Sequence, residues 1–332
     1  MKCRCTWKKN MPWILAFLCL LAVANVWPQE KKEAPAVTAS KAFKLSGYTH
    51  ILYVTQDEGV DSFSIKRARL SFAGELVKNV RFKLQIDAVK SPVLVDAQLD
   101  FSLSPLASFR FGQFKVPFSQ ESLLTAAEID TINRSQPVTK LSPGQDIGSS
   151  GRDIGALFFG KYSIVEYSFG FFNGAGINKT DTNEQKDLAA RFVLRPAGFL
   201  SIAASFYDGH YSEKADVPSV ARKRTGFETA VVYNAFSLKG EFILAKDDTT
   251  SKQGWYLQGG YFILPKKLQA IVKYDSYDKD KNISGDRSHL FTLGMNWFLT
   301  EKTRFMVNFE LYKDESGKTT NSALLAQFQA GF

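Results

Sequence analysis

Apolar and polar residues alternate along most of this chain, in runs of about ten residues that begin near Phe43. Between Val80 and Ala88, apolar side chains occupy every second position, and Arg, Lys, Gln and Asp occupy the positions between them. Successive side chains of a β-strand point to opposite faces, so each run predicts a strand with one apolar and one charged face. Residues 188–195 and 304–311 repeat the pattern.

Short connections alternate with longer polar ones between these runs, which predicts about sixteen strands with short turns at one rim and long loops at the other. A β-sandwich also alternates, but the apolar faces of so many strands exceed what one sandwich core can bury. The sequence therefore predicts an all-β fold, a transmembrane antiparallel β-barrel over residues 42–332. An exposed last strand would invite aggregation, so the strand ending at Phe332 is expected to pair with the strand around Leu45 to Tyr53.

The first 41 residues have a different composition. Residues 1–24 combine a basic start, an apolar run and an Ala22-Val23-Ala24 cleavage pattern, which predicts a cleaved signal peptide and export to the bacterial outer membrane. An uncleaved anchor is the alternative, but the run is short for the roughly 20 residues that span a membrane. Residues 25–41 are polar with two prolines and are expected to form a flexible periplasmic lead-in.

Composition narrows the chemistry. All three cysteines lie within residues 1–24, which excludes thiolate metal sites from the remainder. The formal net charge of +9 includes four cations of that segment, and the remaining charge is too small to argue for nucleic-acid binding. We predict no metal and no cofactor.

Catalytic motifs are absent from the sequence. It contains no G-x-S-x-G, H-E-x-x-H or phosphate-binding glycine loop. His210 and His289 are expected in long loops, and His50 lies on the polar face of the first strand, where it would have to find a serine partner. We predict that the protein is not an enzyme. An outer-membrane β-barrel enzyme and an autotransporter-type translocator are the alternatives.

One connection is much longer than the others. The fifth strand ends at Pro117, and alternation resumes only at Gly151. Residues 119–150 are too polar to cross lipid, because unpaired backbone groups in hydrocarbon cost several kcal/mol each. A barrel of about sixteen strands leaves an aqueous channel. We expect this third external loop to fold into the lumen and narrow the pore; the alternative is an external flap.

Basic residues on the predicted inner faces and in the loop are the candidates for lining the pore and binding anions. They are Arg67, Arg69, Arg81, Lys83, Arg110, Lys115, Arg134, Lys140, Arg191 and Arg304. The first four come from neighbouring strands and would form one basic strip, which favours anions. The alternative is that they pair with Asp96 and Asp100 across the wall.

Two observations limit the anion preference that we expect. The loop carries four carboxylates, Glu121, Glu128, Asp130 and Asp146, against two cations, so the preference should be at most moderate. Lys115 shares a face with Phe109 and Phe111, and it reaches the lumen only if Gly112 marks a bulge that resets the alternation.

Several segments resemble the phosphate-selective porin O and P family, in that family's order and over most of the chain. "GQFKVPF" and "GWYLQGGYF" are the distinctive ones; "RTGFETAVVY" and "LGMNWFL" support them. The resemblance implies a homotrimeric channel of about sixteen strands, with the third external loop in the lumen. The expected function is passive diffusion of small hydrophilic solutes, phosphate or other small anions among them, through a barrel in contact with outer-membrane lipid.

Overall fold

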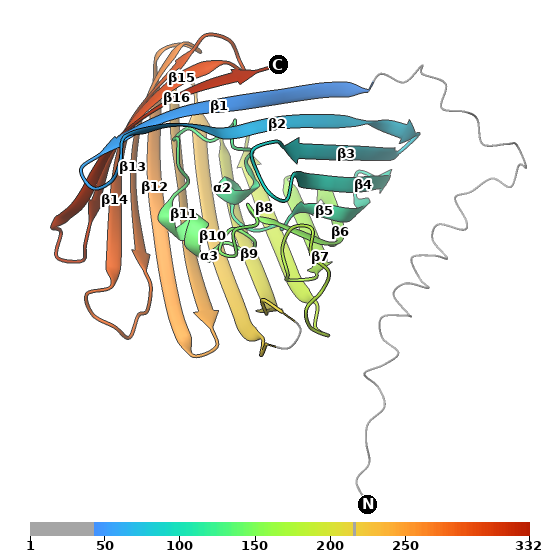
Figure 1. Cartoon of the computed structure of the whole chain (residues 1–332). Coiled ribbons are helices and arrows are strands. Elements are labelled where there is room, and N and C mark those ends of the chain that lie inside the picture. The colour runs from blue at the N-terminus through green and yellow to red at the C-terminus, as the bar shows by residue number, and fades with distance from the viewer. Residues whose placement is uncertain (1–42, 215–216) are drawn as a thin grey trace, which may run out of the picture. The chain divides into compact units, whose positions relative to one another are not determined.

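Sixteen antiparallel strands form a closed barrel in which each strand pairs with the next and β16 pairs with β1 (Figure 1). The computed structural model describes residues 43–214 and 217–332. The predicted signal peptide and lead-in lie outside these residues. The all-β barrel expected from the sequence is confirmed.

The strands have the following bounds: β1 Lys44–Gln56, β2 Ser62–Val77, β3 Val80–Asp87, β4 Leu94–Ser104, β5 Ala107–Lys115, β6 Arg152–Tyr162, β7 Val165–Phe172, β8 Asp187–Ala197, β9 Leu200–Tyr211, β10 Val220–Tyr233, β11 Phe236–Asp247, β12 Thr250–Leu264, β13 Leu268–Asp278, β14 Arg287–Phe298, β15 Arg304–Lys313 and β16 Thr319–Gly331. Two short helices, α2 (Gln120–Leu123) and α3 (Gln136–Leu141), lie between β5 and β6. Within the described residues, no helix is both long enough and apolar enough to span a membrane.

The faces of the strands are inverted relative to a soluble protein. On β3 and β8 the apolar side chains are exposed, with Leu84 46% and Phe192 51% accessible. Gln85 and Asp87, on the other face of β3, are 5% and 0% accessible. Exposed apolar faces all round a closed barrel leave no edge and match a lipid solvent. The predicted alternation is confirmed.

The two ends of the barrel sheet meet as predicted. Tyr48 pairs with Gly331, and the register runs without a break to Gln56 and Ala323. Phe332 continues the pairing, since its N–H donates to the Gly47 carbonyl at 3.0 Å. The terminal aromatic residue is therefore held by the first strand.

Some of the polar stretches expected to be loops are strands. Residues 246–254 are polar, as expected of a long loop, but β11 and β12 pair up to Asp247 and Thr250. His210 and His289, also expected in loops, lie in β9 and β14. At the rim with the long connections, strands extend past the apolar band that faces lipid. A polar composition alone therefore does not mark the end of a strand there.

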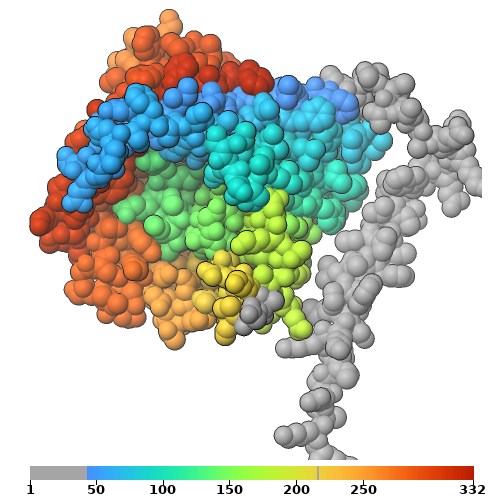
Figure 2. Space-filling view, in the orientation of Figure 1, coloured from blue at the N-terminus to red at the C-terminus, as the bar shows by residue number. Residues whose placement is uncertain are grey.

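The connection between β5 and β6 comprises residues 116–151 and is called the inner segment below. Ser119 caps the start of α2, because its Oγ accepts a hydrogen bond from the Ser122 N–H at 3.1 Å. Pro137 lies in the first turn of α3, where its missing N–H costs no helical hydrogen bond. In Figure 2, green atoms from this middle part of the chain fill the space between the blue and the orange strands.

Candidate functional site

The inner segment is held first by apolar packing. Val138 and Leu141 of α3 are completely buried in a cluster with Ile243 of β11 and Tyr256 of β12. Burying one such aliphatic side chain contributes about 1.5–3 kcal/mol. The inner faces of β11 and β12 are therefore not uniformly polar, and an apolar sector receives the helix.

Glycines on the neighbouring strands make room for this contact. A Cβ added at Gly254 would lie 2.6 Å from Cβ of Pro137, closer than atoms can approach. At Gly226 it would lie 3.0 Å from the ring of Phe118. These glycines belong to the "GWYLQGGYF" and "RTGFETAVVY" segments, so part of each motif exists to seat the inner segment.

Carboxylates on β11 and β13 accept hydrogen bonds from the segment. Glu241 Oε1 accepts from the Glu121 N–H at 2.7 Å and from the Tyr256 hydroxyl at 2.9 Å. Asp275 Oδ1 accepts from the side-chain amide of Gln136 at 2.9 Å. Both helices are thus tied to the same part of the wall.

The carboxylates of the segment meet cations of the wall. Asp146 lies 2.8 Å from Arg222 and 3.1 Å from Arg224, and Asp130 lies 2.7 Å from Lys239. Burial raises the pKa of Asp146, although both arginines act against the rise. The negative balance of the segment, which limited the expected anion preference, is largely neutralised by the wall.

Near β2 and β5 the contacts are of a different kind, since cations bind backbone carbonyls. Lys66 Nζ donates to the Ile132 carbonyl at 2.9 Å, and Lys115 Nζ donates to the Ser122 carbonyl at 2.7 Å. Arg134 donates to the Leu124 carbonyl at 2.7 Å. These contacts hold the chain without cancelling positive charge.

Four of the predicted basic residues pair with carboxylates, and in one of these pairs, Lys83 with Asp96, the partners are those that the alternative named for the strip. Arg69 binds Asp87 at 2.9 Å; Lys83 binds Asp96 and Arg110 binds Asp100, both at 2.7 Å; Arg191 binds Glu228 at 2.5 Å. The four residues of the predicted strip therefore do not act alike, because two of them are neutralised by a neighbour.

The other six have no carboxylate partner within the described residues. Lys115, Arg134 and Arg304 donate to carbonyls of the inner segment, in the last case those of Ala127 and Ile129. Arg67 is partly buried, and its Nε and Nη1 find no acceptor there. Arg81 and Lys140 are exposed.

A bulge at Gly112 was the condition on which Lys115 would reach the lumen. No register shift is present there, because β5 pairs continuously with β4 and β6 through this residue. Gly112 has φ +112°, and an added Cβ would lie 2.1 Å from the Ala97 carbonyl, so only glycine fits. Lys115 still reaches the segment because it is the last residue of β5, where the chain turns at Pro117.

Three further cations were not predicted. Lys66 is the extra residue of a bulge where β1 pairs with β2, since His50 opposes Arg67 while Ile51 opposes Ile65. Lys90 lies in the β3–β4 turn, where burial and then Arg69 and Arg67 lower its pKa. Arg152 shares Asp96 with Lys83. No sequence signal distinguished these cations, since a bulge, a turn or the first residue of a strand, such as Arg152 of β6, is not marked by a period.

His50, the candidate for catalysis, is buried on the polar side, and its Nε2 lies 3.1 Å from Oε1 of Gln329. Its partner is an amide and not the serine that catalysis would require. Within the described residues, no group of three or more His, Cys, Asp or Glu side chains is placed to hold a metal ion.

A closed barrel with an apolar outside and a charged inside defines the class of β-barrel membrane proteins. The chain matches the family model of phosphate-selective porin O and P over residues 46–222 and 211–331 and belongs to this family. It is an outer-membrane porin, as predicted. No match was found among curated protein sequences.

Solved structures agree on the fold. OmpF of Salmonella typhi, in complex with daunomycin, is 10% identical with a TM-score of 0.66, over 87% of this chain and 97% of that chain. OmpT of Vibrio cholerae is 10% identical with a TM-score of 0.64, over 90% and 100%. The channel DcaP of Acinetobacter baumannii is 13% identical with a TM-score of 0.64, over 90% and 100%. At these identities the likeness concerns the fold alone.

Proposed function

We propose that the inner segment lies in the lumen as the constriction of the pore, and that the pore prefers anions. The segment bonds to Lys66 of β2, Glu241 of β11, Asp275 of β13 and Arg304 of β15. All four side chains lie on the face opposite the exposed apolar residues, which in a closed barrel is the face toward the axis. A segment fixed at these points narrows the passage for solutes.

The anion preference rests on one observation, a concentration of cations between the segment and strands β2 to β6. The group, called the basic cluster below, comprises Lys66, Arg67, Arg69, Lys90, Lys115, Arg134 and Arg152. Asp87 and Asp96 are the carboxylates that form ion pairs with its members among the described residues. Cation clusters of this kind attract small anions such as phosphate into a pore.

The remaining predictions complete the proposal. Residues 1–24 direct export and are removed, residues 25–41 form a periplasmic lead-in, and the barrel assembles as a homotrimer in outer-membrane lipid. Small hydrophilic solutes pass by diffusion. Support for the trimer comes from family membership, and support for export comes from the sequence pattern.

The test is electrical recording from single channels in a planar bilayer. Replacing residues 119–150 by a short glycine-serine linker should raise the conductance, because the constriction is removed. The reversal potential in a KCl gradient should have the sign of chloride permeation in the unmodified protein. Unchanged conductance in the shortened variant would make the segment an external flap, and a potential of the potassium sign would refute the anion preference.

A further inference from the structure

A cavity of about 630 Å³ lies beside the inner segment, between α2 and the wall formed by β3 to β8. This volume lies within the range of sites for small organic molecules, about 300–1,000 Å³. An inorganic ion would fill only a small part of it. The cavity is called the α2 pocket below.

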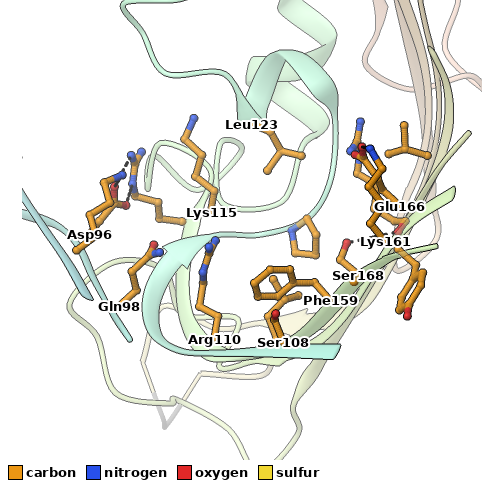
Figure 3. A pocket seen from close by; sticks show the side chains of 18 of the residues that line it. Asp96, Gln98, Ser108, Arg110, Lys115, Leu123, Phe159, Lys161, Glu166 and Ser168 are labelled. Atoms are coloured by element: carbon orange, nitrogen blue, oxygen red, sulfur yellow. Dashed lines mark hydrogen bonds and ion pairs between the residues drawn. The ribbon is translucent and has the colours of Figure 1, made fainter. Parts of the chain in front are cut away.

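The middle of the α2 pocket is apolar. Leu123 of α2 lies opposite Phe159 of β6, and Pro117, Leu157 and Val193 also line the pocket. Figure 3 shows Leu123 and Phe159 between the Asp96 group at one end and the Glu166 group at the other. A hydrated anion gains nothing from such a surface, whereas an apolar body attached to an anion does.

Charge in the pocket is unevenly distributed. Six cations line it: Lys83, Arg110, Lys115, Arg152, Lys161 and Arg191. Asp100 of β4 and Glu228 of β10, which do not line the pocket, neutralise two of them, and Asp96 and Glu166 neutralise two more. Positive charge therefore remains near Lys115, which binds only carbonyls, and near Asp96, which two cations share.

The apolar part and the charged part adjoin at Arg110. Its guanidinium carbon lies 5.2 Å from the centroid of the Phe159 ring, while its nitrogens bind both oxygens of Asp100 at 2.7 and 2.8 Å. The side chain is thus fixed with its charge over an aromatic face, an arrangement that stabilises both groups. The pocket is arranged before any solute enters it.

We propose that the α2 pocket is a binding subsite for small organic acids in which a carboxylate is attached to an aromatic or compact apolar body. The carboxylate lies toward Lys115 and Lys83, and the apolar body lies between Leu123 and Phe159. This proposal rests on the proposed anion-preferring pore and adds a class of solute that the basic cluster alone does not select.

The experiment compares two monoanions that differ in their apolar part. Chloride current through single channels is recorded with increasing sodium benzoate or sodium acetate on one side. Burial of the benzoate ring should bring half-inhibition at a concentration about tenfold lower than for acetate. Equal half-inhibitory concentrations for the two salts would refute the proposed subsite.

Two variants test the position of the ring. Phe159→Ala and, independently, Leu123→Ala should raise the concentration of benzoate that halves the chloride current until it is close to that of acetate. Phe298→Ala is the matched control, because it removes another arginine-stacked ring, 5.5 Å from Arg304, outside the pocket. Retention of the full benzoate preference in both pocket variants, or its loss in the control, would contradict the proposal.

The reversal potential in a KCl gradient separates this proposal from the one on which it rests. Equal inhibition by benzoate and acetate with a chloride-type potential would remove the subsite and leave the anion-preferring pore in place. A potassium-type potential would refute the anion-preferring pore, whatever the benzoate result.

Discussion

The inner segment is held differently by the two walls that it contacts. Toward β10 to β13 its carboxylates meet cations and its N–H groups meet carboxylates, as Asp146 with Arg222 and Glu121 with Glu241 show. Toward β2 and β5 the wall cations Lys66 and Lys115 bind only carbonyls or amide oxygens of the segment. The wall of β10 to β13 therefore holds the segment with little net charge at the contacts. The wall of β2 and β5 holds it with lysines whose positive charge no carboxylate cancels.

This difference shows why a count of charged residues does not give the local charge balance inside the barrel. The segment has more carboxylates than cations, but Asp146 and Asp130 are matched by Arg222, Arg224 and Lys239. Arg67, by contrast, has no carboxylate partner within the described residues. The local balance near β2 is therefore positive although that of the segment is negative.

The largest effect should come from breaking the paired wall. Replacing Arg222 and Arg224 together by alanine leaves the carboxylate of Asp146 buried without a partner, which costs about 3–5 kcal/mol. The second half of the inner segment should detach and become sensitive to protease in the solubilised barrel. Lys223→Ala is the control, since this side chain is 65% exposed and pairs with Asp208 outside the segment. If the double variant resisted protease as well as Lys223→Ala does, apolar packing alone would hold the segment.

A smaller effect is expected at the carbonyl-binding wall. Lys66→Met removes hydrogen bonds to the Ile132 carbonyl and to Oδ1 of Asn133 and leaves these acceptors unpaired, at a cost of about 1–3 kcal/mol. The midpoint of urea unfolding in detergent should fall accordingly, and Lys66→Arg should recover part of the loss. Lys44→Met, at an exposed lysine of β1, should leave the midpoint in place. A midpoint unchanged by Lys66→Met would mean that water replaces both bonds.

The charge itself is tested with Arg67→Gln. A unit charge about 7 Å from a permeating ion, at a dielectric constant of about 80, contributes about 0.6 kcal/mol. This energy has opposite signs for chloride and for potassium, so the ratio of chloride to potassium permeability should fall about sevenfold. The control removes the ion pair of Lys239 and Asp130 by Lys239→Gln with Asp130→Asn, which keeps the net charge and should keep the ratio. A shift in the control as large as that for Arg67→Gln would refute the distinction between the two walls.

The smallest effect should come from salt. The screening length falls from about 10 Å at 0.1 M to about 3 Å at 1 M. The anion preference should weaken over this range, because the basic cluster acts on mobile ions through water. Noise in the single-channel current should not change, since the ion pairs of Asp146 are buried. A preference independent of salt would indicate direct binding instead of attraction at a distance.

The sequence determined the barrel, because its period-2 alternation places every strand with one face toward lipid and one away from it. The exposures of Leu84 and Gln85 follow directly from that period. The closing strand, the position of the long connection and the family were also readable, since each depends on local order along the chain.

Only the tertiary structure decided which charges remain without a carboxylate partner. Arg67 and Arg69 look alike in the sequence. Asp87, 18 residues beyond Arg69, forms an ion pair with Arg69 and not with Arg67. Lys66 turns toward the segment through a bulge set by the pairing of β1 with β2. Ion pairs form between strands and between the wall and the inner segment. Their partners are therefore fixed by the register of the strands and by the path of the inner segment, and neither of these has a period in the sequence.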